Sequence, residues 1–249
     1  IQDTLMFRKG VLAKYNGQDG AVTDYLVQLL KADEVVGAKY ETDLKPATRA
    51  LIEAYVDGIN LWAAENPDAV KPELMPVTGK DIVAGFFLRT PFFFGLDDEL
   101  QELFKDTPQY DVSEKELASF LTDDVPGGAI GSNAFAVAPS RADDGHTRLM
   151  VNSHQPYTGP VAWYEARLKT ETGWDLIGGL FPGTPFPTVG ANPNLGWAHT
   201  VNKPDLLDIY ALTVDDLNKP SQYMLDGTWR EFDVSKAKFR VKLFGPFSI

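Results

Sequence analysis

The sequence contains no cysteine, so neither a disulfide bond nor a metal site built on thiolates is possible. It has no run of 18 apolar residues, and we therefore expect no membrane-spanning helix. It also has fewer basic than acidic residues, 23 against 35, for a net charge of −12. This deficit argues against nucleic acid or an anionic membrane surface as a partner, because both are bound by basic patches.

An initiator methionine and a signal peptide are also missing at Ile1, so we interpret the start as processed or truncated. What the chain does have is apolar and aromatic residues, which make up 44% and 12% of its 249 residues. That is enough for a sizeable core, and the length allows one or two domains.

Helical patterns fill the first part of the chain. The clearest runs from Leu44 to Glu65: Pro46 suits its first turn, and an apolar stripe of Leu51, Tyr55, Ile59 and Trp62 predicts a core-facing side. Further helices are predicted over 1–17, 21–32, 82–94 and 97–104. Strand patterns follow Ser132, at 134–137, 148–151, 162–168, 174–177, 195–201, 207–213, 222–225 and 236–241. Helices followed by closely spaced strands predict an α+β fold with antiparallel pairing.

The segment from Thr107 to Gly131 differs from both parts. It is acidic and is interrupted by Pro108, Pro126, Gly127 and Gly128, with one short helical pattern over 113–121. This composition is typical of a surface segment that can be cut out of a folded protein.

The stretch from Gly131 to Val137 is the most informative one. An alternating apolar run follows Ser132, which predicts a half-buried strand with a serine at its start. A conventional serine nucleophile lies on a strained turn within G-x-S-x-G, and no such motif surrounds Ser132.

The position of Ser132 makes chemical sense if the chain is cut between Gly131 and Ser132. The new terminal amine, with a pKa of roughly 8, could then take the proton of the Ser132 hydroxyl. Glycine before the serine tolerates the distorted backbone that self-cleavage needs. The alternative is a serine that merely begins a strand after a Pro-Gly-Gly loop.

An ordered series of motifs follows Ser132. Its members are Leu149–Pro156, Trp163-Tyr164, Gly178–Pro185, Gly190–Asn192, Gly196–Asn202 and Asp205–Tyr210. The series resembles the start of the β chain in the penicillin acylase family of N-terminal-nucleophile amidohydrolases, closest in kind to acyl-homoserine-lactone, aculeacin and cephalosporin acylases. The resemblance covers Ser132 to Tyr210 strongly and parts of residues 44–103 weakly.

The resemblance implies an αββα sandwich preceded by a helical part. It also implies three segments of a longer heterodimeric precursor: the end of an α chain at 1–106, an excised spacer at 107–131, and the start of a β chain at 132–249. The partners would be the remainder of both chains. Family members carry an oxyanion asparagine and a supporting arginine beyond the position of Ile249, so this fragment is expected to be inactive alone.

The resemblance also implies site residues. Ser132 would be the nucleophile and, through its amine, the base; His154 would orient that amine and donate to the oxyanion. The backbone N–H of Val201 would point into the oxyanion hole, and Asn133 would help processing. His154 and His199 could equally be structural histidines.

An acyl pocket and a calcium site are implied as well. Trp163, Phe181, Phe186 and the aromatic cluster of residues 86–94 could line the pocket, although core packing is as well founded for any one of them. Asp205, Asp208 and the carbonyl of Leu207 match a structural calcium site, with Glu99 as a weaker candidate; the oxygen ligands suit this cation. Solvated acids at a strand end are the alternative. No organic cofactor is expected.

The resulting functional hypothesis is an N-terminal serine amidohydrolase that cleaves an acyl-homoserine lactone or a related fatty-acyl amide. A β-lactam acylase is the alternative within the family. Two alternatives lie outside it: a conventional serine hydrolase using Ser132 and His154 without cleavage, and a noncatalytic, calcium-stabilised secreted binding domain. A periplasmic or secreted location rests on the resemblance alone.

Overall fold

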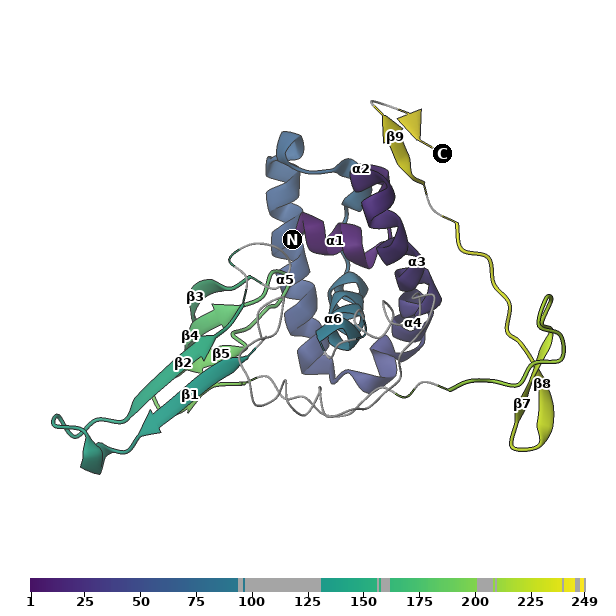
Figure 1. Ribbon diagram of the computed structural model, residues 1–249. Coiled ribbons are helices and arrows are strands. Elements are labelled where there is room, and N and C mark those ends of the chain that lie inside the picture. Colours follow the sequence, from purple (N-terminus) through teal and green to yellow (C-terminus); the bar gives the residue numbers. More distant parts are fainter. Residues whose placement is uncertain are drawn as a thin grey trace.

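The computed structural model describes residues 1–93, 96, 131–155, 157, 162–200, 208, 210–238, 240–244 and 247–248. Helices form the first part and antiparallel strands the second, as the α+β prediction requires (Figure 1). The helices are α1 (Gln2–Arg8), α2 (Leu12–Asn16), α3 (Ala21–Leu29), α4 (Ala32–Asp43), α5 (Pro46–Glu65) and α6 (Gly79–Phe93), with short 3-10 turns at Gly17–Gly20, Pro67–Ala69 and Pro72–Leu74.

The helical part has its main core between α1, α5 and α6. Leu5 and Met6 from α1 pack with Ile52 and Val56 from α5 and with Ile82 from α6. The predicted stripe on α5 is displaced by one residue: Ile52 and Val56 are buried, whereas Trp62 is 53% exposed. Tyr55 and Ile59 pack against the edge of this core. Because the faces of a helix differ by 100° per residue, a one-residue shift turns Trp62 out to solvent.

The predicted helix over 1–17 is in fact two helices. Gly10, at φ +58°, adopts a left-handed conformation between α1 and α2, which glycine accepts without strain. The carboxylate of buried Asp24 then accepts 2.8 Å hydrogen bonds from the backbone N–H groups of Leu12 and Ala13 at the start of α2. These N–H groups have no acceptor within their own helix, and the Asp24 carboxylate serves as that acceptor.

The strands form one larger sheet and three hairpins among the described residues. β1 (Ser132–Val137) pairs with β2 (Arg148–Ser153), with a 3-10 turn at Pro139–Arg141 between them. The four-stranded antiparallel sheet has the order β3 (Tyr164–Lys169), β4 (Asp175–Leu180), β5 (Val189–Ala191) and β6 (Gly196–Trp197). The other hairpins are β7 (Gln222–Leu225) with β8 (Thr228–Glu231), and β9 (Lys242–Phe244) with β10 (Phe247–Ser248).

Several strand predictions need correction. The strand predicted over 195–201 is limited to β6 among the residues described up to 200, and the described residues of 207–213 and 236–241 contain no strand. The β1–β2 hairpin is more exposed than the half-buried strand that was predicted, with Phe135 at 58% exposure. The predicted helices at 97–104 and 113–121 lie outside the described residues, and the αββα sandwich and segment boundaries stay predictions.

The larger sheet contacts the helices through Tyr55 on α5. Its hydroxyl lies near Tyr164 at the start of β3 and near the backbone of Gly183 after β4. Burial, together with the nearby Tyr164 hydroxyl, raises the pKa of Tyr55.

The close approach of β4 and β5 makes Gly178→Ala a test of the sheet. A Cβ at Gly178 would lie 2.0 Å from the carbonyl oxygen of Val189, so the strands must separate. We expect a loss of about 1–3 kcal/mol in the free energy of unfolding, the usual effect of overpacking. Urea unfolding of the full-length protein measures it.

Gly37→Ala is the matched control for this substitution. Gly37 lies on α4, and a Cβ there meets nothing within 4 Å. Because alanine favours helix over glycine, this variant should gain roughly 0.5–1 kcal/mol in stability. Equal stability of the two variants would show that β4 and β5 are not in close contact.

Candidate active site

A cavity lies between α6, the start of β1 and the four-stranded sheet, and we call it the Ser132 cavity. It has an empty volume of about 770 Å³, which includes the space open to solvent at its mouth. Its lining residues come from seven separate stretches of the chain: Phe86, Arg89, Thr90, Ser132, Ser153, Gln155, Trp163, Phe181, Thr188, Val189, His199 and Thr200. Its lining therefore combines aromatic rings with hydroxyl-bearing side chains.

Ser132 is the first residue of β1 and is partly buried. It lies opposite Ser153 in the register of the β1–β2 hairpin. Its Oγ donates a 2.5 Å hydrogen bond to the carbonyl oxygen of Gly131. The backbone N–H of His154 donates to the same oxygen at 3.1 Å. The carbonyl of the predicted cleavage site therefore accepts two hydrogen bonds, one of them from the predicted nucleophile.

The predicted contact of His154 with a free Ser132 amine stays a prediction, and in the uncut chain its side chain lies beside Asn133. It is exposed and is not among the side chains that line the Ser132 cavity. Its Nε2 lies 3.1 Å from Oδ1 of Asn133, which accepts a hydrogen bond when Nε2 carries the proton. The structure thus brings together Ser132, Asn133 and His154, with the backbone of His154 nearest to the chemistry. His199, in contrast, lines the cavity.

Two of the predicted pocket aromatics stack on each other in the cavity wall. The rings of Trp163 and Phe181 lie 3.9 Å apart between centroids, with 18° between their planes. Phe86, on α6, lines the same cavity. Phe186 is 42% exposed and does not line the cavity. Phe87 packs in the helical core instead, and the side chains of residues 92–94 lie outside the described residues.

Arg89 was not predicted, although it lines the cavity from α6. Desolvation lowers the pKa of its guanidinium. The group lies over the rings of Phe86 and Phe181, at 5.6 and 6.0 Å from their centroids, and Nη2 donates to the carbonyl oxygen of Pro182 at 3.4 Å. The sequence did contain a signal for it, because Arg89 is the single charged residue within the aromatic run of α6.

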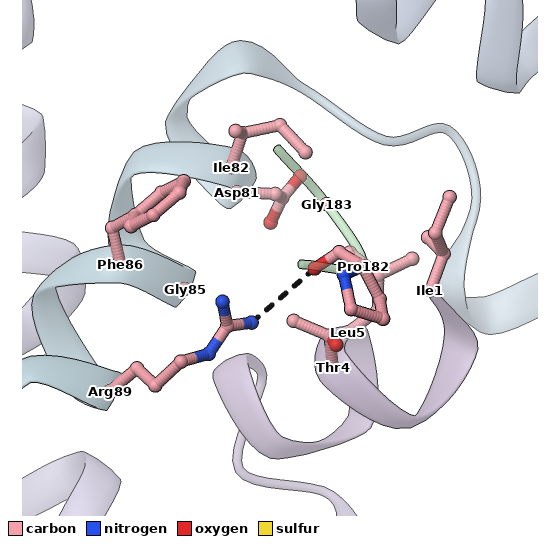
Figure 2. Close-up of a pocket in the computed structure, with 10 residues that line it drawn as sticks. All are labelled: Ile1, Thr4, Leu5, Asp81, Ile82, Gly85, Phe86, Arg89, Pro182 and Gly183. Atoms are coloured by element: carbon pink, nitrogen blue, oxygen red, sulfur yellow. Dashed lines mark hydrogen bonds between the residues drawn. The ribbon is translucent and has the colours of Figure 1, made fainter. Parts of the chain in front are cut away.

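Behind the cavity wall lies a second, smaller space, which we call the Arg89 hollow. Figure 2 shows the guanidinium of Arg89 pointing between α6, α1 and the Pro182–Gly183 turn. The hollow has an empty volume of about 280 Å³, and its other lining residues include Thr4, Leu5, Asp81 and Phe86. Arg89 and Phe86 therefore belong to the wall between the two spaces.

The remaining predicted site residues cannot be placed together. Val201, Asp205, Leu207 and Glu99 lie outside the described residues. Asp208 is described; it is exposed and belongs to no strand. Within the described ranges, no group of three His, Cys, Asp or Glu side chains could hold a metal ion. The calcium site stays a prediction.

None of the described helices is both long and apolar enough to cross a bilayer.

Comparisons with known proteins agree with the resemblance seen in the sequence. The family model described as penicillin amidase matches residues 1–246. Acyl-homoserine lactone acylase PvdQ of Pseudomonas fluorescens Pf0-1 is 27% identical over 229 residues, covering 84% of this chain and 28% of its own length. The PvdQ of Pseudomonas putida is 33% identical over 115 residues, 46% of this chain and 14% of its own length.

Aculeacin-A acylase of Actinoplanes utahensis is 29% identical over 98 residues, which cover 39% of this chain and 12% of that protein. The chain thus spans less than a third of the length of these curated relatives. The family model, however, matches nearly the whole chain, and the chain therefore belongs to the penicillin amidase family.

Proposed function

We propose that this chain is part of an N-terminal serine amidohydrolase, which is activated by its own cleavage between Gly131 and Ser132. The observation that carries the proposal is the pair of hydrogen bonds on the Gly131 carbonyl, from Ser132 Oγ and from the backbone N–H of His154. The pair lies beside a cavity that Ser132 itself lines. Membership of the penicillin amidase family supports the same interpretation.

The self-cleavage would begin with rotation of Ser132 Oγ from the carbonyl oxygen of Gly131 to its carbon. A C–O bond forms, the C–N bond to Ser132 breaks, and the hydroxyl proton passes to the departing nitrogen. The N–H of His154 already donates to the oxygen that carries negative charge during this step, which is the arrangement of an oxyanion donor. Water then hydrolyses the ester and leaves a carboxylate on Gly131 and a free amine on Ser132.

The same atoms would then act on an acyl amide. Ser132 Oγ attacks the amide carbonyl, its own amine takes the hydroxyl proton, and that proton passes to the departing amine of the substrate. Water releases the acid from the acyl-enzyme by the reverse use of the amine. The α-amine suits this task because its ordinary pKa of about 8 leaves a useful neutral fraction near pH 7.

The substrate class we propose is an acyl-homoserine lactone or a related fatty-acyl amide. The Phe86, Trp163 and Phe181 rings give the Ser132 cavity an apolar wall that suits an acyl chain. Two relatives carry the name acyl-homoserine lactone acylase, which supports this choice over a β-lactam acylase. We further propose an αβ heterodimer with the rest of the precursor, structural Ca²⁺, and a periplasmic or secreted location.

Intact mass and N-terminal sequencing of the protein expressed from the complete gene test the proposal first. Two chains are expected, one of them beginning Ser132-Asn133-Ala134. A single chain that hydrolyses acyl amides would support the conventional serine hydrolase instead. A single chain with no hydrolysis of any acyl amide would support the noncatalytic binding domain.

A further inference from the structure

Arg89 is a shielded cation without a counter-ion in the part of the chain that the structure describes. None of the ion pairs there includes it, and desolvation is the cause of its lowered pKa. Its Nε and Nη1 atoms are shielded from solvent and have no hydrogen-bond acceptor among the residues that the structure describes. Its one hydrogen bond, from Nη2 to Pro182, is long at 3.4 Å. An uncompensated buried donor is expensive, and more so when it is charged.

The carboxylate that lines the Arg89 hollow already has partners of its own. Asp81 borders the Arg89 hollow, as Figure 2 shows. Its Oδ1 pairs with Arg8 and Lys9, at 2.9 and 3.8 Å, and its Oδ2 accepts from Thr78. Both oxygens of Asp81 therefore already contact α1 or the start of α6. Asp81 does not act as an acceptor for Arg89.

Trp163 adds a second donor of the same kind. Its Nε1 is shielded from solvent without a partner among the described residues, while its ring stacks on Phe181. Both Trp163 and Arg89 line the Ser132 cavity. The aromatic wall of the cavity thus contains N–H groups that no acceptor in the described part of the chain satisfies. Polar groups in unfavourable surroundings are characteristic of functional sites.

The side chain of Arg89 can turn towards such an acceptor at little expense. It is held by two ring faces and one long hydrogen bond, and no ion pair with another described residue must break. A carboxylate or carbonyl oxygen in the cavity would receive a charge-assisted hydrogen bond, two of them in the carboxylate case.

We propose that Arg89, assisted by Trp163, anchors an oxygen atom on the acyl group of the substrate. The enzyme would then prefer acyl chains that carry a keto or carboxylate oxygen over plain alkyl chains of equal length. This inference rests on the proposed acylase function and assigns the specificity of its pocket to a residue outside the reacting centre.

The test uses the full-length protein and three amides of p-nitroaniline with eight-carbon acyl groups: octanoyl, a keto-octanoyl and 7-carboxyheptanoyl. Wild-type kcat/KM should be higher for one or both oxygenated substrates. Arg89→Met should lower kcat/KM for the preferred substrate by about tenfold to a hundredfold, the worth of a hydrogen bond to a charged group. The octanoyl value should change by less than about threefold, because the alkyl chain makes no such bond.

Two further variants keep the test decisive. Trp163→Phe retains the stacked ring but removes the N–H, and it should reduce the same preference by a smaller factor. If Arg89→Met does not fold, Arg89→Lys replaces it in the test. Because lysine keeps the charge, this variant should retain part of the preference for the oxygenated substrates. Arg230→Met, on exposed β8, is the matched control and should leave all three values unchanged.

Equal kcat/KM for all three substrates in the wild type would overturn the proposal, as would an equal loss on all three in Arg89→Met. The second result would show that Arg89 only supports the Pro182 turn. Neither result would touch the proposed function, whose failure would appear separately as absence of the chain beginning at Ser132 and of any amide hydrolysis.

Discussion

Ser132→Ala is expected to abolish both self-cleavage and acyl hydrolysis. Because the side chain of Ser132 supplies the attacking oxygen for both reactions, its removal leaves no nucleophile. Loss of a nucleophile from a hydrolase typically lowers kcat by about 10⁴- to 10⁶-fold. Intact mass should show one uncut chain that continues from Gly131 through the substituted position, and acyl amide hydrolysis should fall to background.

Ser132→Cys separates the two reactions. A thiol can attack the Gly131 carbonyl, so cleavage should persist at a changed rate, and a time course by intact mass measures it. Ser140→Ala is the matched control, because Ser140 is an exposed serine in the turn after β1. It should be cleaved and be active like the wild type. Normal cleavage in Ser132→Ala would contradict the proposed mechanism.

Elements with strong local signals could be predicted from the sequence. Pro46 marks the start of α5, predicted over 44–65 and found at Pro46–Glu65. The Asp226-Gly227 turn ends β7 where expected, with both residues at positive φ. In each case the backbone preference of one or two residues fixes the boundary, and no distant partner is needed.

Elements that depend on distant partners were missed. On α4, Val36 and Tyr40 are buried one turn apart, but Gly37 and the polar residues around them give no clear apolar stripe. β5 is only Val189–Ala191, and it is a strand because its backbone pairs with β4 and β6. Pairing of this kind depends on the packing of the whole sheet, which a short window of sequence does not contain.

The site divides in the same way. Ser132, Trp163 and Phe181 could be named because they belong to motifs with a recognisable order. Arg89 could not, because its importance comes from the meeting of α6 with Phe181 and the Pro182 turn, about 90 residues away. Its charge is conspicuous in the aromatic run only once that run is known to line a cavity.

Asp81→Ala should be the most destabilising of the substitutions considered. Asp81 is 5% exposed and is the third residue of α6. Its Oδ2 accepts from the N–H and the hydroxyl of Thr78, at 2.8 and 2.7 Å, while its own N–H donates to Thr78 Oγ at 3.2 Å. This reciprocal cap satisfies N–H groups at the start of α6 that have no helical partner.

The same carboxylate holds α1. Its Oδ1 lies 2.9 Å from Nε of Arg8, a close ion pair whose N–H direction is not aligned for a hydrogen bond. Removing Asp81 leaves Arg8 paired only with the exposed Asp33, and breaking a buried ion pair costs about 3–5 kcal/mol. Asp81→Ala should therefore lower the free energy of unfolding by about that range, because the cap is lost together with the pair.

Asp33→Ala is the control that shows how much of the effect depends on the burial of the ion pair. Asp33 pairs with the same Arg8 but is 76% exposed, so solvent screens the pair and its loss should cost no more than about 1 kcal/mol. Urea unfolding of both variants in the full-length protein compares them. Asp81→Asn should fall between the two, because its amide oxygen still accepts from Thr78 although the charge is gone. If Asp33→Ala were as damaging as Asp81→Ala, the stability would reside in the charge of Arg8 and not in the buried cap that positions α6.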